Sequence, residues 1–308
     1  MSENKKTMSR RKRFLKQIDL QLMVWPWLLW LLVFAYIPMM GIVIAFQNFQ
    51  PSTGVFHSEW VGFENFWNFV NTPDFWGLIR NTLGINLLKL VFSFPIPIIF
   101  AILLYELPFR RMKRLAQTVS YLPHFLSWVI VTGIFSQFLE PEGPVNDLLL
   151  KLNIIDEGIM WRALEWFFWP LMVISGVWKE LGWNAIIYIA AMAAISPELY
   201  EAAQVDGASR FQRIWKITLP MIMPTITVTL LFTLAGLFSA GFDQIYLFQN
   251  STVLEVSEVL DTYIYKMGFS KGLYSFAAAG GLFQSVINLI IVVLANRAAK
   301  KINGNGLW

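Results

Sequence analysis

The chain contains no cysteine and has only two histidines among its 308 residues. Without cysteine there can be no disulfide bond, thiolate nucleophile or cysteine-based metal site. The patterns H-E-x-x-H and G-x-S-x-G are also missing, which argues against an intramembrane enzyme. We expect His57 to be an exposed loop residue and His124 to have a structural role, because a proton relay at His124 needs acidic partners that the sequence does not place.

A phosphate-binding loop of the pattern G-x-x-x-x-G-K-[ST] is absent as well, so the chain cannot bind ATP in that way. Charged residues are scarce: they make up 14% of the chain, whereas hydrophobic residues make up 56%. A soluble domain carries about 25% charged and about 45–50% apolar residues. Both differences predict an integral membrane protein.

Long apolar segments support this prediction. A helix that crosses the hydrocarbon core needs roughly 20 mostly apolar residues. Six segments qualify, at about 25–46, 78–104, 115–139, 167–192, 221–248 and 276–295. Prolines interrupt three of them, and we expect kinks there, because neighbouring groups in a bundle can satisfy the freed carbonyls. These residues are Pro38, Pro95, Pro97 and Pro123.

The distribution of Lys and Arg predicts the orientation of the spans. Of the 24 such residues, 17 fall in the two tails and in the loops after the second and fourth segments. The alternate loops, which include 47–75 and 140–166, hold only 4. Cytoplasmic loops carry the excess of positive charge. Both termini are therefore expected in the cytoplasm.

The loop after the fourth segment reads S-P-E-L-Y-E-A-A-Q-V-D-G from residue 196 to residue 207. Ser196 suits an N-cap, Pro197 suits the first helical position, and Glu198 complements the positive helix end. Gly207 follows where a glycine can take a left-handed C-cap. These features predict a short helix, a turn and a second helical piece on the cytoplasmic face, suited to docking on a soluble partner. An ordinary amphipathic loop at the membrane surface remains the alternative.

This loop resembles the "EAA" loop of binding-protein-dependent ABC import permeases. The matching positions are Glu201, Ala202, Ala203, Gly207, Ile217, Leu219 and Pro220. The segment 81–83 is similar to the start of the membrane domain of that family. The segments 121–128, 241–246 and 306–308 are similar to the branch of sugar permeases that imports oligosaccharides released from polysaccharides, whose pattern differs from that of the maltose type. The similarity extends from about residue 20 to the end of the chain.

The resemblance implies an all-α integral membrane protein with six transmembrane helices and the type I ABC importer permease fold. In that family the loop forms coupling helices that sit in a cleft of the ATP-binding subunit. The resemblance therefore places Glu201, Ala202, Ala203 and Gly207 at this contact. It implies that Ile217, Leu219 and Pro220 position the following helix.

The implied function is that of a permease subunit, not an enzyme, which moves an oligosaccharide across the cytoplasmic membrane of a prokaryote. The implied partners are a second homologous permease in a heterodimer, two ATP-binding subunits, an extracytoplasmic sugar-binding protein and membrane lipid, with no nucleic acid. The chain itself would hold no cofactor, because ATP and Mg bind to the ATPase. The expected regions are a basic cytoplasmic tail (1–21), the first transmembrane helix with its external loop (22–75), the transmembrane domain (76–297) with the coupling loop (196–220), and a cytoplasmic tail (298–308).

Polar residues inside spans are costly and usually face a bundle interior or a wet path. The fourth segment carries such residues next to aromatic ones, and these form the first part of the predicted substrate path: Trp178, Lys179, Trp183 and Asn184. The alternative is a contact between helices or subunits. Glu180 follows Lys179 directly, so the two side chains point about 100° apart on a regular helix and are not expected to pair ideally. Gly182 is expected to mark a local break.

The fifth segment supplies the second part of the path. By resemblance to maltose-type permeases, its end lines the translocation cavity with Ser239, Phe242, Asp243 and Gln244. An alternative role for Asp243 is to brace the partner permease. Asn86 and Asn288 are expected to form hydrogen bonds between helices.

Two other functions stay open at this stage. One is an ABC permease for peptides or amino acids. The other is an ion-coupled secondary transporter, although the inverted repeats that are usual in that class are not evident in the sequence.

Overall fold

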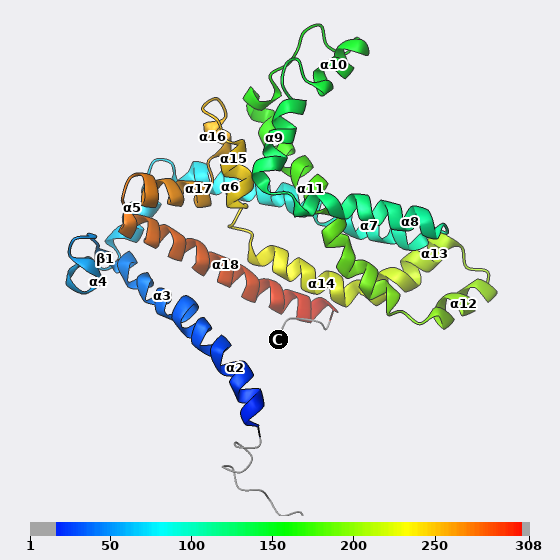
Figure 1. The fold of residues 1–308 in the computed structure, drawn as a ribbon, viewed down its shortest axis with the longest axis horizontal. Coiled ribbons are helices and arrows are strands. Elements are labelled where there is room, and N and C mark those ends of the chain that lie inside the picture. Colours follow the sequence, from blue (N-terminus) through cyan, green and yellow to red (C-terminus); the bar gives the residue numbers. More distant parts are fainter. Residues whose placement is uncertain (1–16, 304–308) are drawn as a thin grey trace, which may run out of the picture.

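The computed structural model describes residues 17–303, which fold almost entirely into helices (Figure 1). Most of the basic tail and the end motif at 306–308 lie outside the described residues. The helical elements are α2 (Ile18–Leu31), η1 (Leu32–Tyr36), α3 (Ile37–Met39), η2 (Met40–Phe46), α4 (Gly54–His57), α5 (Glu64–Val70), α6 (Phe75–Leu88), η3 (Lys89–Ser93), α7 (Pro95–Glu106), α8 (Arg110–Tyr121), η4 (Leu122–Phe125), α9 (Trp128–Phe138), α10 (Pro144–Lys151), η5 (Trp161–Ala163), α11 (Glu165–Ala193), α12 (Pro197–Val205), α13 (Arg210–Arg213), η6 (Ile214–Thr218), α14 (Leu219–Ala235), α15 (Phe242–Phe248), α16 (Leu254–Ser257), α17 (Leu260–Tyr265), η7 (Lys266–Ser270) and α18 (Tyr274–Asn303).

Four helical runs are long and apolar enough to cross a membrane, namely Ile18–Phe46, Phe75–Glu106, Arg210–Ala235 and Tyr274–Lys301. Two bent pairs raise the number to six if each pair counts as one span. Arg110–Phe125 meets Trp128–Phe138 at 105°, and Glu165–Ala193 meets Pro197–Val205 at 70°. The all-α fold and the six predicted segments are thus confirmed.

Two predicted segments are not single helices, however. In the segment at 115–139, the α-helix ends just before Pro123, which lacks a backbone donor. The segment is then broken after η4, where the backbone of Leu126 and Ser127 is extended. The segment at 221–248 is broken between α14 and α15, where Gly241 has a φ of +88°. Hydrophobic length does not reveal such breaks, since both halves remain apolar.

Three π-turns share one relation to proline. Each of η1, η3 and η6 begins six residues before a proline, respectively Pro38, Pro95 and Pro220. Proline has no N–H, and its ring clashes with the carbonyl four residues earlier. A wider π-turn removes this conflict without ending the helix. Two of the expected kinks, at Pro38 and Pro95, therefore take the form of π-turns.

The helices pack around three apolar clusters, and α11 contributes to two of them. On the side of α12, residues of α7, α11 and α14 pack together. On the opposite side, α11 packs with α6 and α15. The third cluster joins α5, α6 and α17 to partly buried residues of α18. Outside the bundle, the two short antiparallel strands β1 (Gln47–Asn48) and β2 (Glu59–Trp60) pair Gln47 with Trp60 in the first external loop.

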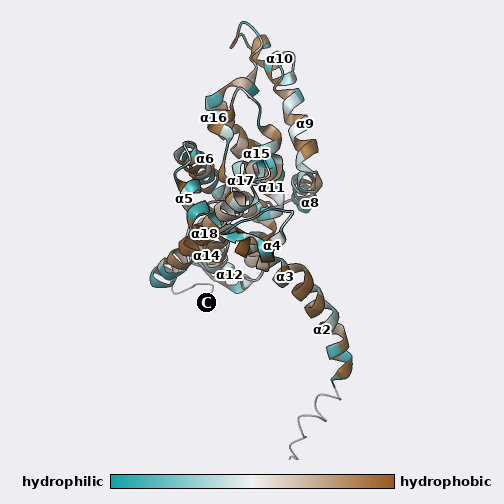
Figure 2. Cartoon of the chain, turned by 90° about the vertical axis from the view of Figure 1, so that its left-hand side faces the viewer, coloured by the Kyte–Doolittle hydropathy of each residue, from teal (hydrophilic) through white to brown (hydrophobic). Residues whose placement is uncertain are grey.

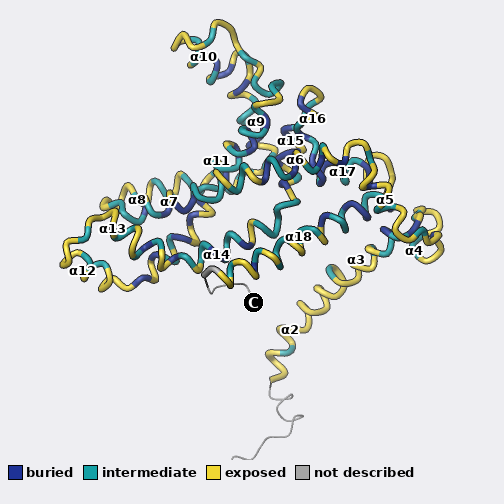
Figure 3. Tube along the Cα trace, turned by 180° about the vertical axis from the view of Figure 1, so that it is seen from behind, coloured by how far each residue is buried: buried dark blue, intermediate teal, exposed yellow. Residues whose placement is uncertain are grey.

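The first span leaves the bundle. Figures 1 and 3 show α2 and α3 projecting away from the other helices, and Figure 2 shows that this arm is mostly hydrophobic. Only 6% of the most apolar stretch of Ile18–Phe46 is buried, against 17–22% in the other three unbroken spans. An apolar arm of this kind requires lipid or another subunit around it.

Candidate functional site

The predicted short helix of the loop after the fourth span is α12, which lies at one end of the molecule and far from β1 and α4 at the other end (Figure 1). None of its residues is buried, as the exposed colour of this segment in Figure 3 shows. Val205 is 89% exposed and Leu199 is 44% exposed. Two large apolar side chains on a protruding helix are suited to a protein partner.

The turn after α12 depends on Gly207, which has a φ of +76°, as the sequence predicts. Ser196 occupies the predicted N-cap position, but its side chain accepts no capping hydrogen bond. A capping box that the sequence analysis missed starts the second helical piece: Ser209 Oγ accepts from the Gln212 backbone, and Gln212 Oε1 accepts from the Ser209 backbone. The S-x-x-Q spacing is the signal that could have revealed it.

A hydrogen bond joins α12 to the span that follows it. Tyr200 Oη lies 3.0 Å from Thr218 Oγ1, and Thr218 is buried at the end of η6. Tyr200 and Ile217 both pack against the apolar cluster of α7, α11 and α14. This contact and the continuous chain α13–η6–α14 are thus two connections between α12 and the bundle.

The predicted coupling residues divide between surface and bundle. Glu201, Ala202 and Gly207 are exposed, and Ala203 is half-buried. The remaining three lie in or beside η6, where Ile217 and Leu219 are half-buried and Pro220 is exposed and follows the π-turn. The separate roles that the resemblance implies for the two groups stay predictions.

In the fourth span, Lys179 and Glu180 form an ion pair, with 2.9 Å between Nζ and Oε1. The prediction that they would not pair well is wrong, because both side chains are long enough for their charged ends to meet although they leave the helix about 100° apart. Glu180 Oε2 also lies 2.7 Å from His124 Nδ1, and Lys179 Nζ donates to the His124 carbonyl oxygen at 2.7 Å. His124 is stacked on Trp183, with ring centroids 4.1 Å apart.

This cluster ties α11 to the break at Pro123. Lys179 is buried, and its two hydrogen bonds go to the His124 carbonyl oxygen and to Glu180, so within this chain it braces the break. Its place in the substrate path stays a prediction. The structural role expected of His124 agrees with this arrangement, although Glu180 now supplies the acidic neighbour that the sequence did not place. His57 is exposed, as expected.

Gly182 does not break the helix, since α11 is continuous from Glu165 to Ala193. Its function is close packing: a Cβ built at this position would lie 2.3 Å from the Ser120 backbone oxygen. The expected local break is therefore wrong, and the glycine lets α8 approach α11.

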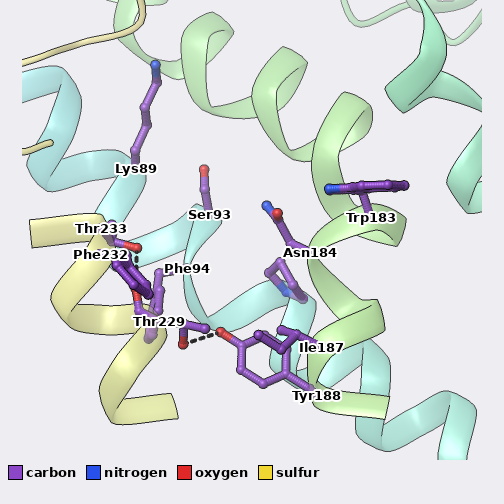
Figure 4. Close-up of a pocket in the computed structure, with 11 residues that line it drawn as sticks. Lys89, Ser93, Phe94, Trp183, Asn184, Ile187, Tyr188, Thr229, Phe232 and Thr233 are labelled. Atoms are coloured by element: carbon purple, nitrogen blue, oxygen red, sulfur yellow. Dashed lines mark hydrogen bonds between the residues drawn. The ribbon is translucent and has the colours of Figure 1, made fainter. Parts of the chain in front are cut away.

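Two cavities adjoin the middle of α11. The larger, of about 410 Å³, is lined by Lys89, Ser93, Phe94, Pro97, Trp183, Asn184, Ile187, Tyr188, Thr229, Phe232 and Thr233 (Figure 4). The smaller, of about 260 Å³, shares four of these residues and adds Trp128, Gly176, Val177, Glu180, Leu181, Gly241 and Gln244. Aromatic rings beside amide and hydroxyl groups are the surroundings that a sugar ring needs.

The structure brings only some of the predicted path residues together. Trp183 and Asn184 line the larger cavity, and Gln244 lines the smaller one. Trp178 packs edge-on against Phe135, and Phe242 stacks on Tyr246.

The two acidic residues near the break in the fifth span behave differently. Ser239 Oγ donates to Asp261, whose carboxylate also accepts from the Ala240 N–H at 2.9 Å and from Gln284 Nε2 at 2.7 Å. Asp243 is exposed and forms no ion pair within the described part of the chain. Asp261, which the sequence analysis missed, is thus the bracing carboxylate at this break.

Two asparagines confirm their expected role between helices. Asn86 Nδ2 donates to the Leu237 carbonyl oxygen at 2.7 Å, and Asn288 Oδ1 accepts from the Phe238 N–H at 2.9 Å. Together with Asp261, they satisfy backbone groups that the break after α14 sets free. Polar partners of this kind are what permits a broken helix inside a membrane.

Sequence reasoning also missed Lys89 and Ser93, which line both cavities. Lys89 Nζ donates to the Ala240 carbonyl oxygen at 2.8 Å and to Gln244 Oε1 at 2.7 Å. A lone cation within an apolar run, six residues before a proline, is the signal that could have identified this site.

Comparison with known proteins agrees with this geometry. Residues 93–304 match the family described as "Binding-protein-dependent transport system inner membrane component". Protein LplB of Bacillus subtilis (strain 168) is 44% identical over 290 residues, which cover 94% of this chain and 91% of LplB. The polygalacturonan/rhamnogalacturonan transport system permease protein YteP of the same organism is 42% identical over 304 residues, covering 97% of this chain and 94% of YteP.

A solved structure has the same fold. A crystal structure of a bacterial alginate ABC transporter, in complex with an alginate pentasaccharide-bound periplasmic protein, contains a chain that superposes with a TM-score of 0.88. The two sequences are 37% identical, and the superposition covers 96% of this chain and 99% of the other.

Proposed function

Because this chain belongs to the family of binding-protein-dependent transport system inner membrane components, we propose that it lines one half of the path by which an ATP-driven importer moves an oligosaccharide into the cell. The chain is a multi-pass permease subunit of the inner membrane, and the ATPase resides in a separate subunit. Membership of this family also excludes the ion-coupled secondary transporter that the sequence left open. The proposed transmembrane domain, 76–297, overlaps the family match at 93–304.

The protruding helix α12 carries the proposed link to the ATPase. It bears the Glu201-Ala202-Ala203 motif, none of its residues is buried, and Gly207 turns the chain back toward the bundle. ATP and Mg would bind in the docked ATPase, whose stroke would reach α14 through η6. This arrangement is the single observation that supports coupling most strongly.

Relatives and the cavity lining support an oligosaccharide as cargo. YteP is named for transport of polygalacturonan and rhamnogalacturonan, and the solved complex holds an alginate pentasaccharide on its periplasmic protein. In this chain, Trp183, Phe94 and Phe232 offer rings, while Asn184 offers an amide for sugar hydroxyl groups. Peptide or amino acid cargo has no comparable support.

The exposed first span supports a second permease subunit as partner. Its apolar residues need cover, and the other described helices leave α2 and α3 almost entirely exposed. We propose a heterodimer with a homologous permease, two ATPase subunits on the side of α12, and an extracytoplasmic sugar-binding protein on the opposite side.

Native mass spectrometry of the affinity-purified complex tests this assembly. The expected complex contains one copy of this chain, one homologous permease and two ATPase subunits. A variant in which Leu199 and Val205 are both changed to Asp should lose the ATPase subunits and keep the second permease. Purification of the chain without any ATPase, or full retention of the ATPase by this variant, would contradict the proposal.

A further inference from the structure

Lys89 is an isolated cation in the middle of a span. It lies near the centre of Phe75–Glu106 and lines both cavities beside α11. Its two hydrogen bonds go to neutral oxygens, those of Ala240 and Gln244. Within residues 17–303, no carboxylate comes within ion-pair distance of Nζ. An ammonium has three donors, so one N–H remains for a ligand.

The nearby carboxylates do not cancel this charge directly. Glu180 lines the smaller cavity, but both of its oxygens are occupied by Lys179 and His124. Asp261 accepts the Ala240 N–H, whereas Lys89 binds the carbonyl oxygen of the same residue. The peptide group of Ala240 therefore separates Asp261 from Lys89, and Asp261 lines neither cavity.

Two uncharged polar groups accompany Lys89. The π-turn η3 carries Ser93 on the same wall, and its buried hydroxyl has no hydrogen-bond partner within the described part of the chain. Asn184 lines both cavities from α11. Figure 4 shows the polar ends of Lys89, Ser93 and Asn184 pointing toward the same end of the larger cavity, away from Ile187 and Tyr188.

A buried hydroxyl without a partner is costly unless a ligand or water satisfies it. An ammonium, a hydroxyl and an amide that line the same two cavities supply the kinds of donor that a carboxylate and an adjacent sugar hydroxyl need. Charge-assisted hydrogen bonds to a carboxylate are about twice as strong as neutral ones.

We propose that Lys89, Ser93 and Asn184 form a subsite for the carboxylate of a uronic acid residue, so that the importer prefers acidic oligosaccharides. The inference rests on the proposed function as an oligosaccharide importer and adds the charge of the cargo and the residues that read it. Lys89 supplies the charge, Ser93 and Asn184 orient the carboxylate, and Trp183 and Phe94 supply the apolar walls.

The competing role for Lys89 is to brace the Ala240 carbonyl oxygen. Two cargoes that differ only in charge distinguish this role from binding of the cargo carboxylate. The probes are an oligogalacturonate and its fully methyl-esterified, uncharged form of the same length. ATP-dependent uptake is measured as a function of cargo concentration, in proteoliposomes that hold the full complex and its binding protein. Comparing each variant with wild type for one cargo cancels the contribution of the binding protein.

In Lys89→Met, the half-saturating concentration of the acidic cargo should rise about tenfold, which matches the loss of one charge-assisted hydrogen bond. The half-saturating concentration of the esterified cargo should change by less than about twofold, because an uncharged ester has no charge-assisted hydrogen bond with Lys89 to lose. Lys89→Arg should keep the preference for the acid, and Ser93→Ala should weaken it. Lys151→Met removes an exposed cation on α10 and serves as the control without effect.

Equal losses for the two cargoes in Lys89→Met would show a bracing role and overturn the proposal. No loss for either cargo, or wild-type uptake of the ester alone, would overturn it as well. If wild type imports only the acidic cargo, the half-saturating concentrations of Lys89→Arg and Lys89→Met for this cargo are compared instead. Equal concentrations in the two variants overturn the proposal. Absence of all uptake in wild type would instead contradict the proposed function itself.

Discussion

Small side chains at single positions determine how closely the spans approach each other. Gly182 of α11 lies against the backbone of Ser120 in α8, and a methyl group has no room there. A hydropathy pattern cannot distinguish such a glycine from one that breaks a helix. The sequence therefore singled out Gly182 but predicted a helix break there. Its actual packing partner, the backbone of Ser120, lies far away in the chain.

Gly182→Ala should lower the free energy of unfolding by about 1–3 kcal/mol, the usual cost of overpacking. The measurement is the unfolding of the purified protein in detergent by titration with a denaturing surfactant. Gly133→Ala in α9 is the matched control, since a Cβ there meets nothing within 4 Å. Equal stability of the two variants would show that α8 and α11 are not in close contact.

The two acidic residues near the break in the fifth span also differ in how closely they contact the bundle. The carboxylate of Asp261 accepts hydrogen bonds from the Ala240 backbone and from Gln284, whereas Asp243 is exposed. Asp261→Ala should therefore destabilise the protein by about 1–3 kcal/mol, the cost of leaving buried donors without partners. Asp243→Ala should leave the midpoint of thermal unfolding unchanged. A reversed order would contradict the placement of α17 beside the break.

At the scale of elements, the sequence predicts helices better than it predicts their interruptions. Length and apolarity locate all six segments, and Gly207 marks the turn after α12. The break between α14 and α15 depends on side chains from α6, α17 and α18, which lie elsewhere in the chain. No local pattern contains that information. The roles of the predicted coupling and path residues stay predictions.

The turn at Gly207 provides a test of coupling. Its φ of +76° suits glycine and is tolerated by asparagine, but it is strained for a β-branched residue. No neighbouring atom of this chain lies within 4 Å of a Cβ there, so within the chain a substitution acts through the backbone. Gly207→Val combined with Glu201→Arg should abolish cargo uptake while ATP hydrolysis and membrane insertion persist.

Gly207→Asn alone should retain most of the uptake and serves as the control. ATP hydrolysis and uptake are measured on the same proteoliposomes, and insertion is measured by flotation of the vesicles. Full uptake in the double variant would contradict the assignment of α12 to coupling.

At the scale of the whole molecule, the proposed assembly requires the two ends of the bundle to face opposite sides of the membrane. The distribution of Lys and Arg places α12 in the cytoplasm and the loop that contains β1 and β2 outside. The chain has no cysteine, so a single introduced cysteine reports on its own position without background.

Ser52→Cys in the first external loop should react with a membrane-impermeant maleimide on intact cells stripped of any outer barrier. Gln204→Cys in α12 should react only after the membrane is opened. Both residues are exposed in the fold of this chain. The chain is produced without its ATPase, which would otherwise cover α12, so a difference in labelling reflects the side of the membrane. Labelling of both positions on intact cells would contradict the orientation.

The most direct measurement of the central claim is uptake of a labelled oligosaccharide into proteoliposomes that hold this chain with its second permease and its ATPase. With the sugar-binding protein outside and ATP inside, cargo should accumulate, and it should stop accumulating when ATP is replaced by a non-hydrolysable analogue. Accumulation that follows an ion gradient without ATP, or no accumulation with all subunits present, would contradict the account.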